Sequence, residues 1–319
     1  MKIGFYNDFR PCILKDNGVV DISSEVQQLQ GGSPQLTLEN IIVNFQFLRP
    51  RLERLAEQGA ATSLGDVRLR PPVPRPGKVL CGRGNFMEGV PVEPARPLAT
   101  FFKSPDAVIG PGDTIVLPSF RPVIFHHEAE LAFVIGKAAS NVPVAQALDY
   151  VFGYTTSVDV SARAPVEGEA TLPGEYGKSF DTFLPIGPAI TTADEISDPN
   201  NLNVKYSVNG QLRQDYNTSD MEHSVAYLIA ALSANMTLKP GDLILCGTNH
   251  QGLGPLQDGD LGEIEIECVG RSHNNVVDSM KRTWSRAIDP GTGERIRERR
   301  ESQQGVPSTG TWPLTPPTS

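Results

Sequence analysis

The feature that most constrains the fold of this chain is the segment 125–136, which reads FHHEAELAFVIG. Alternate residues of a β-strand share a face, so a strand here places Glu128 and Glu130 on the same side. Further along, both faces of the segment are apolar, which predicts a strand covered on both sides. Two carboxylates about 7 Å apart on a covered face are unfavourable, because they repel each other and lose hydration.

A bound cation is one arrangement that removes this penalty. Carboxylate oxygens at the spacing of Glu128 and Glu130 suit Mg²⁺, Mn²⁺ or Ca²⁺. The alternative is that both carboxylates face water. Segment 263–267, EIEIE, shows the pattern expected in that case, because its glutamates alternate with Ile264 and Ile266 as on an ordinary half-exposed strand.

Two further side chains could belong to the same site. Asp159 lies in the apolar, β-branched run YTTSVDVSAR, where an unpaired carboxylate is unfavourable, so it is a candidate third ligand. Arg163 offers the alternative of a simple ion pair with Asp159. Lys178, in GKSFD, is either a solvated turn residue or a positive charge that binds a substrate carboxylate or stabilises an enolate.

The whole chain predicts an α+β fold in three parts. Residues 1–73 combine an opening strand, Lys2–Tyr6, with a helical pattern and form a small N-terminal domain. Residues 77–270 are rich in strands that follow Gly-Asp or Asn-Gly turns, which favours curled or sandwiched sheets. Residues 271–319 form a C-terminal extension, and we expect no regular structure in about its last 25 residues.

One of the few helices in the central part is expected to begin at Ser219. The hydroxyl of this residue can cap the helix while Glu222 reaches back to the same turn.

Composition excludes several classes of protein. The 28 Lys and Arg residues against 37 Asp and Glu give a net charge of −9, which does not suit nucleic acid or anionic membrane. No stretch approaches the roughly 18 apolar residues of a membrane span, and the first residues do not resemble a signal peptide. The four cysteines lack metal or disulfide spacing, so we expect buried thiols and a cytoplasmic location.

Six phrases in family order make the chain resemble the fumarylacetoacetate hydrolase family, in its acylpyruvate hydrolase and oxaloacetate decarboxylase-like branch. They are FFKSPDAVIGPGD, HHEAELAFVIG, DYVFGYTTSVDVSAR, GKSFDTFLPIGP, VNGQLRQ and LKPGDLILCGT. The resemblance implies a mixed β-roll or sandwich catalytic core with a small N-terminal α/β domain. It also implies a homodimer that acts on a small oxo acid.

The same resemblance assigns roles to particular residues. It implies that a divalent cation, Mg²⁺ or else Mn²⁺ or Ca²⁺, is held by three carboxylates, Glu128, Glu130 and Asp159. Lys178 would lie in the active site and bind substrate, with Arg163 nearby in the same role. Thr248, in the CGT phrase, would contact substrate oxygens.

The chain departs from the family pattern in GNFMEGVPVE, residues 84–93. Many hydrolytic and decarboxylating members carry N-Y-x-x-H-x-x-E here, and its His and Glu activate water. In this chain Gly89 and Val92 occupy those two positions, so a hydrolase would need another base. The candidates are His126, on the face of the glutamates, and His250, in the altered phrase CGTNHQGLG.

We therefore predict a divalent-metal-dependent enzyme that hydrolyses a C–C bond in a 2,4-dioxo, acylpyruvate-like acid through a metal-stabilised enolate. Two alternatives stay open. The same site could decarboxylate or tautomerise a 2-oxo acid, or the chain could be a binding homologue that keeps the metal pocket without hydrolytic activity.

Overall fold

The carboxylate-bearing segment lies inside the protein in the computed structural model, which describes residues 1–163 and 176–305. It forms two strands, β10 (Phe125–His126) and β11 (Ala129–Ile135), and every residue of both strands is buried. The expectation of a strand covered on both faces is therefore confirmed.

β11 belongs to a large sheet that also contains the N-terminal strands. The strands of this large sheet lie in the order β4 (Thr62–Ser63), β3 (Gly18–Asp21), β2 (Arg10–Lys15), β1 (Lys2–Tyr6), β14 (Leu184–Thr192), β12 (Val151–Val158), β11, β17 (Leu243–Leu245), β6 (Val79–Arg83) and β7 (Ala99–Phe102). β5 (Leu69–Arg70) pairs with β1, and β8 (Val108–Ile109) pairs with β14. Because β1 is hydrogen-bonded to β14, the N-terminal strands continue the central sheet. The division at residue 73 stays a prediction.

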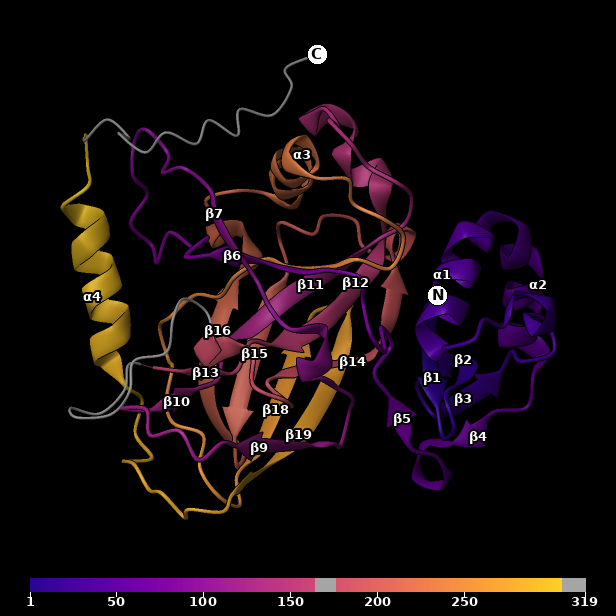
Figure 1. Cartoon of the computed structure of the whole chain (residues 1–319), viewed down its shortest axis with the longest axis horizontal. Coiled ribbons are helices and arrows are strands. Elements are labelled where there is room, and N and C mark those ends of the chain that lie inside the picture. Colours follow the sequence, from indigo (N-terminus) through magenta and orange to yellow (C-terminus); the bar gives the residue numbers. More distant parts are fainter. Residues whose placement is uncertain (164–175, 306–319) are drawn as a thin grey trace.

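A second sheet packs against the first. Its strands, in order, are β16 (Gln211–Asn217), β15 (Asn203–Val208), β18 (Leu261–Ile266), β19 (Gly270–Asp278) and β9 (Thr114–Leu117). Residues of β19 contact β14, and residues of β15 contact β11, so the two sheets enclose the apolar core (Figure 1). A small separate pair joins β10 to β13 (Ser161–Ala162). The predicted α+β class with sandwiched sheets is confirmed.

Two sequence signals in the second sheet are confirmed. Asn209 and Gly210 form the turn between β15 and β16 with φ angles of 52° and 75°, the left-handed values that an Asn-Gly hairpin adopts. In β18, Ile264 and Ile266 are buried while Glu265 is exposed, as expected for an ordinary half-exposed strand.

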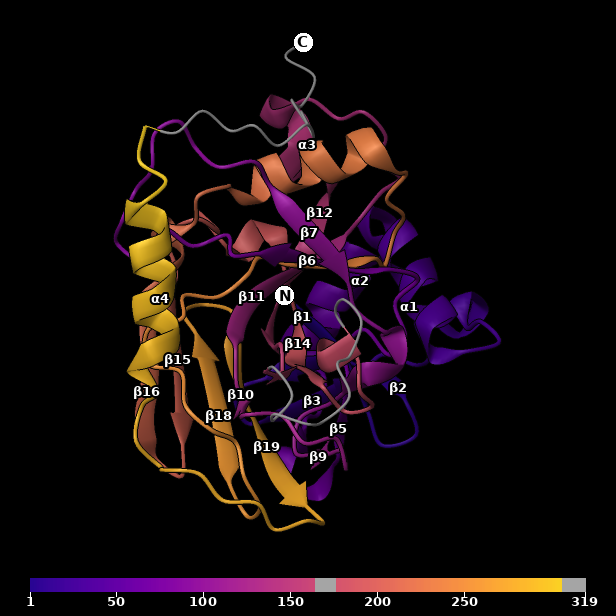
Figure 2. The same ribbon diagram turned by 60° about the vertical axis from the view of Figure 1, so that its left-hand side comes forward.

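The helices cover the margins of the sheets (Figures 1 and 2). They are α1 (Pro34–Val43), α2 (Phe45–Gln58), α3 (Val225–Asn235) and α4 (Pro290–Glu301). Short 3-10 turns lie at Gln27–Leu29, Leu64–Asp66, Pro105–Ala107, Val144–Tyr150, Tyr176–Lys178, Ala193–Glu195 and Thr218–Asp220. No helix among the described residues has the length and apolar character needed to cross a lipid bilayer.

The predicted start of the third helix at Ser219 is wrong. Ser219 lies in a 3-10 turn, and α3 begins six residues later, where the hydroxyl of Ser224 accepts a hydrogen bond from the Tyr227 N–H. Glu222 does not reach back to this turn, because its carboxylate pairs instead with Arg96 and Arg300.

Helix α4 occupies part of the C-terminal segment in which no regular structure was expected. Asp289 caps the helix by accepting from the Gly291 N–H, and Pro290 takes the first helical position, which suits its fixed φ. The guanidinium of Arg300 is completely buried and holds the helix against the protein. Residues 306–319, for which the same expectation was made, lie outside the described residues.

The contacts of Arg300 join the C-terminal extension to the segment 84–93. Its Nε donates to the carbonyl of Val90 at 2.8 Å, and its Nη1 donates to the carbonyl of Phe86 at 3.2 Å and to Glu222 at 3.0 Å. The extension is therefore an integral part of the structure up to this residue.

Three of the cysteines, Cys12, Cys81 and Cys246, are buried thiols, as expected. Cys268 is exposed, because it occupies the tight turn between β18 and β19 with a φ of 61°.

Arg300→Met should lower the free energy of unfolding by about 2–4 kcal/mol, because the Phe86 and Val90 carbonyls lose their donor and buried Glu222 loses one of two cationic partners. Urea unfolding measures this change. Arg297→Met, on the exposed side of the same helix, is the control and should stay within about 0.5 kcal/mol of the wild type. Equal stability of the two variants would contradict the anchoring role.

Candidate active site

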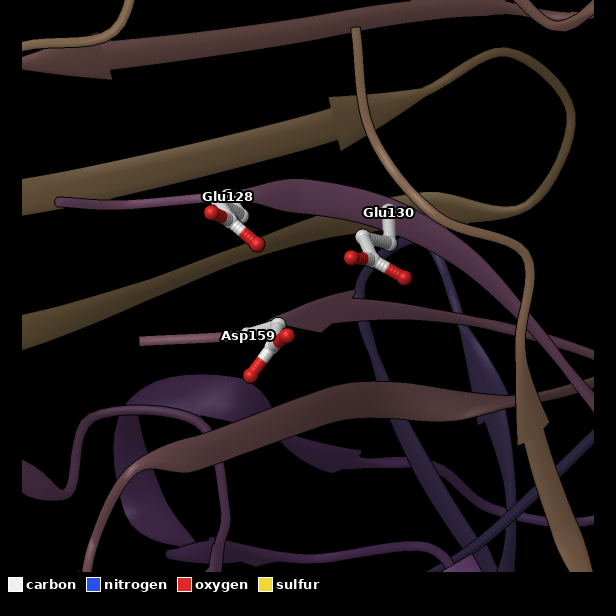
Figure 3. Close-up of side chains that lie close together, drawn as sticks. All are labelled: Glu128, Glu130 and Asp159. Atoms are coloured by element: carbon white, nitrogen blue, oxygen red, sulfur yellow. The ribbon is translucent and has the colours of Figure 1, made fainter. Parts of the chain in front are cut away.

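Three carboxylates converge because of the pairing of β11 with β12. The register places Ala129 opposite Val158, so Glu128 and Asp159, one step outside this pair, face each other. The Asp159 N–H donates to the Glu128 carbonyl at 2.8 Å. Glu130 projects to the same side as Glu128, since alternate residues share a face. Figure 3 shows the three carboxyl groups pointing into one space, where one oxygen of each lies within 4.8 Å of the others.

Lysine and arginine side chains form ion pairs with two of these carboxylates, Glu128 and Asp159. Lys178 Nζ lies 2.7 Å from a Glu128 oxygen and 2.6 Å from an Asp159 oxygen. Arg163 donates to the other oxygen of Glu128, so the simple ion pair with Asp159 that the sequence left open is not formed. Lys103, which the sequence analysis missed, is fully buried and donates to Asp159 at 2.5 Å.

These contacts shift the pKa values of Glu128 and Glu130 in opposite directions. Burial would raise the pKa of Glu128, but Arg163 and Lys178 outweigh it and hold that pKa well below its usual value. For Glu130, burial and the negative charges of Asp159 and Glu128 raise the pKa well above its usual value. Burial would lower the pKa of Lys178, but the carboxylates of Asp159 and Glu128 raise it.

The donor set fits a hard divalent cation. All three groups offer carboxylate oxygens, they are buried together, and Glu130 lacks enough nearby positive charge to ionise easily. A divalent cation placed among them would supply that charge.

Glu130 is held in place by the loop that follows β17. The Gly247 N–H donates to Glu130 Oε2 at 2.8 Å. Gly247 has a φ of +91°, and a Cβ at this position would lie 3.0 Å from the Gly82 carbonyl oxygen, so only glycine fits without strain.

Thr248 is held by the neighbouring strands. Its hydroxyl donates to the Ala129 carbonyl at 2.8 Å and accepts from the side-chain amide of Gln214, also at 2.8 Å. Gln214 is fully buried and also accepts from the Ala129 N–H through its oxygen. The sequence analysis assigned no role to Gln214, so its bracing role was missed.

The carboxylates border a cavity of about 150 Å³. The other residues that line it are Gly82, Arg83, Gly84, Phe101, Arg163, Lys178, Thr248 and His250. The structure therefore brings Lys178, Arg163, Thr248 and His250 together around the candidate ligands.

His126 is not among the described residues that line this cavity. Its ring is fully buried, Nδ1 accepts from Arg163 Nε at 3.0 Å, and Nε2 lies 3.2 Å from the Asp289 carboxylate. Burial, followed by the charge of Arg163, lowers the pKa of His126 to about 4. The position of His126 suits the orientation of Arg163 better than the activation of water.

His250 is paired with Glu88, a residue that the sequence analysis did not select. His250 Nδ1 lies 2.7 Å from Glu88 Oε1, and the His250 backbone N–H donates to the same oxygen at 2.9 Å. Both residues are buried. When Nδ1 donates its proton to this carboxylate, Nε2 becomes the ring atom that accepts a proton, which is the arrangement of a general base with its orienting acid.

The backbone around Glu88 is fixed by a second acid. The Glu88 N–H donates to Asp220 Oδ2 at 2.9 Å, and Asn249 Nδ2 donates to the same oxygen at 2.8 Å. Glu88 and Gly89 both have positive φ, at 56° and 73°, so the chain reverses here and turns Glu88 toward His250. Gly89 and Val92, at the expected His and Glu positions, provide no base.

Comparisons with known proteins identify the family of the chain. The family model described as "Fumarylacetoacetate (FAA) hydrolase C-terminal" matches residues 83–277. Maleylpyruvate hydrolase of Aquipseudomonas alcaligenes is 33% identical over 286 residues, which are 85% of this chain and 97% of that protein. Oxaloacetate tautomerase fahd2 of Xenopus laevis, a mitochondrial protein, is 40% identical over 230 residues, 67% of this chain and 70% of that protein.

A solved structure is similar over nearly the same length. The crystal structure of maleylpyruvate hydrolase from Sphingobium sp. SYK-6, in complex with manganese(II) ion and pyruvate, has a TM-score of 0.77 and 34% sequence identity. The similarity covers 87% of this chain and 99% of that chain.

Glu130→Gln should weaken Mn²⁺ binding by about 10- to 100-fold, because it removes one negative ligand while keeping the acceptor for the Gly247 N–H. Isothermal titration with MnCl₂ measures the affinity. Glu265→Gln, an exposed glutamate on β18, is the control and should bind Mn²⁺ like the wild type. Unchanged binding by Glu130→Gln would contradict a cation site at these carboxylates.

Proposed function

Because the chain belongs to the fumarylacetoacetate hydrolase family, we propose that it is a divalent-metal-dependent hydrolase that cleaves a C–C bond in a 2,4-dioxo, acylpyruvate-like acid. The observation that carries the proposal is the buried His250–Glu88 pair, since His250 borders the same cavity as the three carboxylates. Hydrolysis needs a base for water, and this pair provides one.

Glu128, Glu130 and Asp159 would hold the cation. When bound, it would supply positive charge to the oxo and carboxylate oxygens of the substrate. Lys178 and Arg163 keep the neighbouring carboxylate of Glu128 ionised and oriented. Mg²⁺ as the preferred cation, a homodimeric assembly and a cytoplasmic location are part of the same proposal.

In this proposal His250 removes a proton from water while Glu88 holds the Nδ1–H and stabilises the imidazolium that forms. The water oxygen attacks the C4 carbonyl carbon of the substrate. The C3–C4 bond then breaks, C4 leaves as a carboxylic acid, and C3 takes up a proton to give pyruvate. Lys178 contributes positive charge to the cavity in which the enolate oxygen becomes negative.

The relatives support hydrolysis as the first candidate. Similarity to the maleylpyruvate hydrolases extends over most of this chain, and one of their structures contains manganese and pyruvate. Tautomerisation of a 2-oxo acid is the second candidate, supported by 40% identity to oxaloacetate tautomerase over a shorter part of the chain. It would use the same base for proton transfer at carbon.

His250→Gln should lower kcat on an acylpyruvate by about 100-fold or more, because the base is lost, while Mn²⁺ affinity stays unchanged. Glu88→Gln should lower kcat less, because the amide can still contact Nδ1 without stabilising the imidazolium. The control is His273→Gln, which changes an exposed histidine of β19. This variant should keep the wild-type kcat. Full turnover by His250→Gln would contradict the assignment of His250 as the base.

Metal removal and product identification separate the candidate reactions. The wild type is incubated with acetylpyruvate, fumarylpyruvate or oxaloacetate and Mn²⁺ or Mg²⁺, and EDTA should abolish turnover in every case. Equal amounts of pyruvate and the released acid indicate hydrolysis. Loss of the oxaloacetate enol without pyruvate indicates tautomerisation, and release of CO₂ indicates decarboxylation. Oxalate binding with no turnover of any substrate would favour the binding homologue and contradict the proposal.

A further inference from the structure

A line of contacts joins the start of helix α4 to the carboxylate cavity. The helix begins beside β10 (Figure 1), where the carboxylate of its capping residue, Asp289, lies 3.2 Å from His126 Nε2. On the other side of the imidazole ring, Nδ1 accepts a hydrogen bond from Arg163 Nε at 3.0 Å. Arg163 also donates from Nη2 to Glu128, one of the three candidate ligands. The contacts therefore lead from the C-terminal helix to the cavity that Arg163 lines.

The donor chemistry of this line fixes the tautomer of the imidazole. A guanidinium group only donates hydrogen bonds, so His126 Nδ1, which faces Arg163, must offer a lone pair. The proton of the neutral ring then lies on Nε2. Nε2 is buried and meets the geometry of a full hydrogen bond with no described residue, so the Asp289 carboxylate at 3.2 Å is the acceptor available to it.

Strand pairing places His126 and Arg163 side by side. β10 pairs with β13, which sets His126 opposite Ser161. The Arg163 N–H, directly after β13, donates to the Ile124 carbonyl at 2.9 Å. The backbone is therefore held on both sides of the imidazole–guanidinium contact. Because the guanidinium of Arg163 also donates to His126 and Glu128 at two different nitrogens, its plane is fixed at the border of the cavity.

The segment that carries Asp289 is attached to β10 and the neighbouring loops. The Trp284 indole donates from Nε1 to the Val123 carbonyl at 2.6 Å, and its ring packs edge-on against Phe125 with the centroids 5.9 Å apart. The Asp289 N–H donates to the Leu253 carbonyl at 2.7 Å. These contacts hold the Asp289 carboxylate beside the imidazole.

We propose that Asp289 and His126 are positioning residues for Arg163, so that the C-terminal segment sets the orientation of a guanidinium group in the active site. This segment lies beyond residues 83–277, the part that the family model matches. Asp289 accepts the Nε2 proton, which keeps Nδ1 turned toward Arg163, and Arg163 presents its guanidinium to an anionic ligand in the cavity. The inference rests on the proposed function, because that function places the oxo acid in this cavity.

Asp289→Ser tests this role, because it separates the contact with His126 from the helix cap. Asp289 Oδ1 accepts from the Gly291 N–H, while Oδ2 faces His126. A serine hydroxyl can accept from an N–H two residues ahead, as Ser104 does in this chain, but it is too short to replace Oδ2. Isothermal titration of the Mn²⁺-loaded protein with oxalate should show about tenfold weaker binding than in the wild type. The urea midpoint should stay unchanged, because Ser and Asp are comparable helix caps.

Three further variants separate positioning from other effects. Glu294→Gln, which removes the same charge from an exposed position of the same helix, should bind oxalate like the wild type. His126→Asn should keep most of the affinity, because its amide oxygen can replace Nδ1 as the acceptor for Arg163, whereas His126→Leu should lose it. In an Arg163→Lys background, Asp289→Ser should cause no further loss, because Asp289 acts through Arg163.

Equal oxalate affinity of Asp289→Ser and the wild type would overturn the positioning role. An equal loss in Glu294→Gln would also overturn it, since that result would indicate general electrostatics, and so would an undiminished effect of Asp289→Ser in the Arg163→Lys background. The proposed function fails separately. If oxalate affinity follows the expected pattern while no acylpyruvate is cleaved, the positioning role stands and the assignment as a hydrolase does not.

Discussion

The structure of the site depends on the compensation of three buried negative charges. Glu128, Glu130 and Asp159 are buried side chains, and one oxygen of each lies within 4.8 Å of the others. The ammonium groups of Lys178 and Lys103 neutralise part of this negative charge through ion pairs. The negative charge of Glu130 is not fully neutralised, and its pKa is raised. Because positive charge is lacking at Glu130, the site suits a divalent cation better than a closed ion-pair network.

Buried negative charge is also compensated by cations at the periphery of the site. Glu222 is buried between two arginines, and one of them, Arg300, also holds the carbonyls of Phe86 and Val90. Through this residue the C-terminal helix supports the loop that carries Glu88. The position of Glu88 beside His250 therefore depends in part on this one buried guanidinium.

Much of the site could be predicted from local sequence. The alternation in FHHEAELAFVIG predicted a covered strand with two convergent glutamates, and the apolar run around Asp159 marked it as the third acid. The alternative of a simple ion pair between Arg163 and Asp159 is not realised, because Arg163 pairs with Glu128. The helix start at Ser219 was wrong, because Glu222 has stronger partners in two arginines than in a helix turn.

The sequence by itself determined the strand, the candidate ligands and the family, because side-chain alternation and motif order are properties of short, contiguous segments. Only the tertiary structure decided which histidine lies at the cavity beside a buried carboxylate. Glu88 and His250 are 162 residues apart, and they meet because a left-handed turn, held by Asp220, directs Glu88 inward. Such a contact depends on how distant segments pack, and no local pattern of residues encodes it.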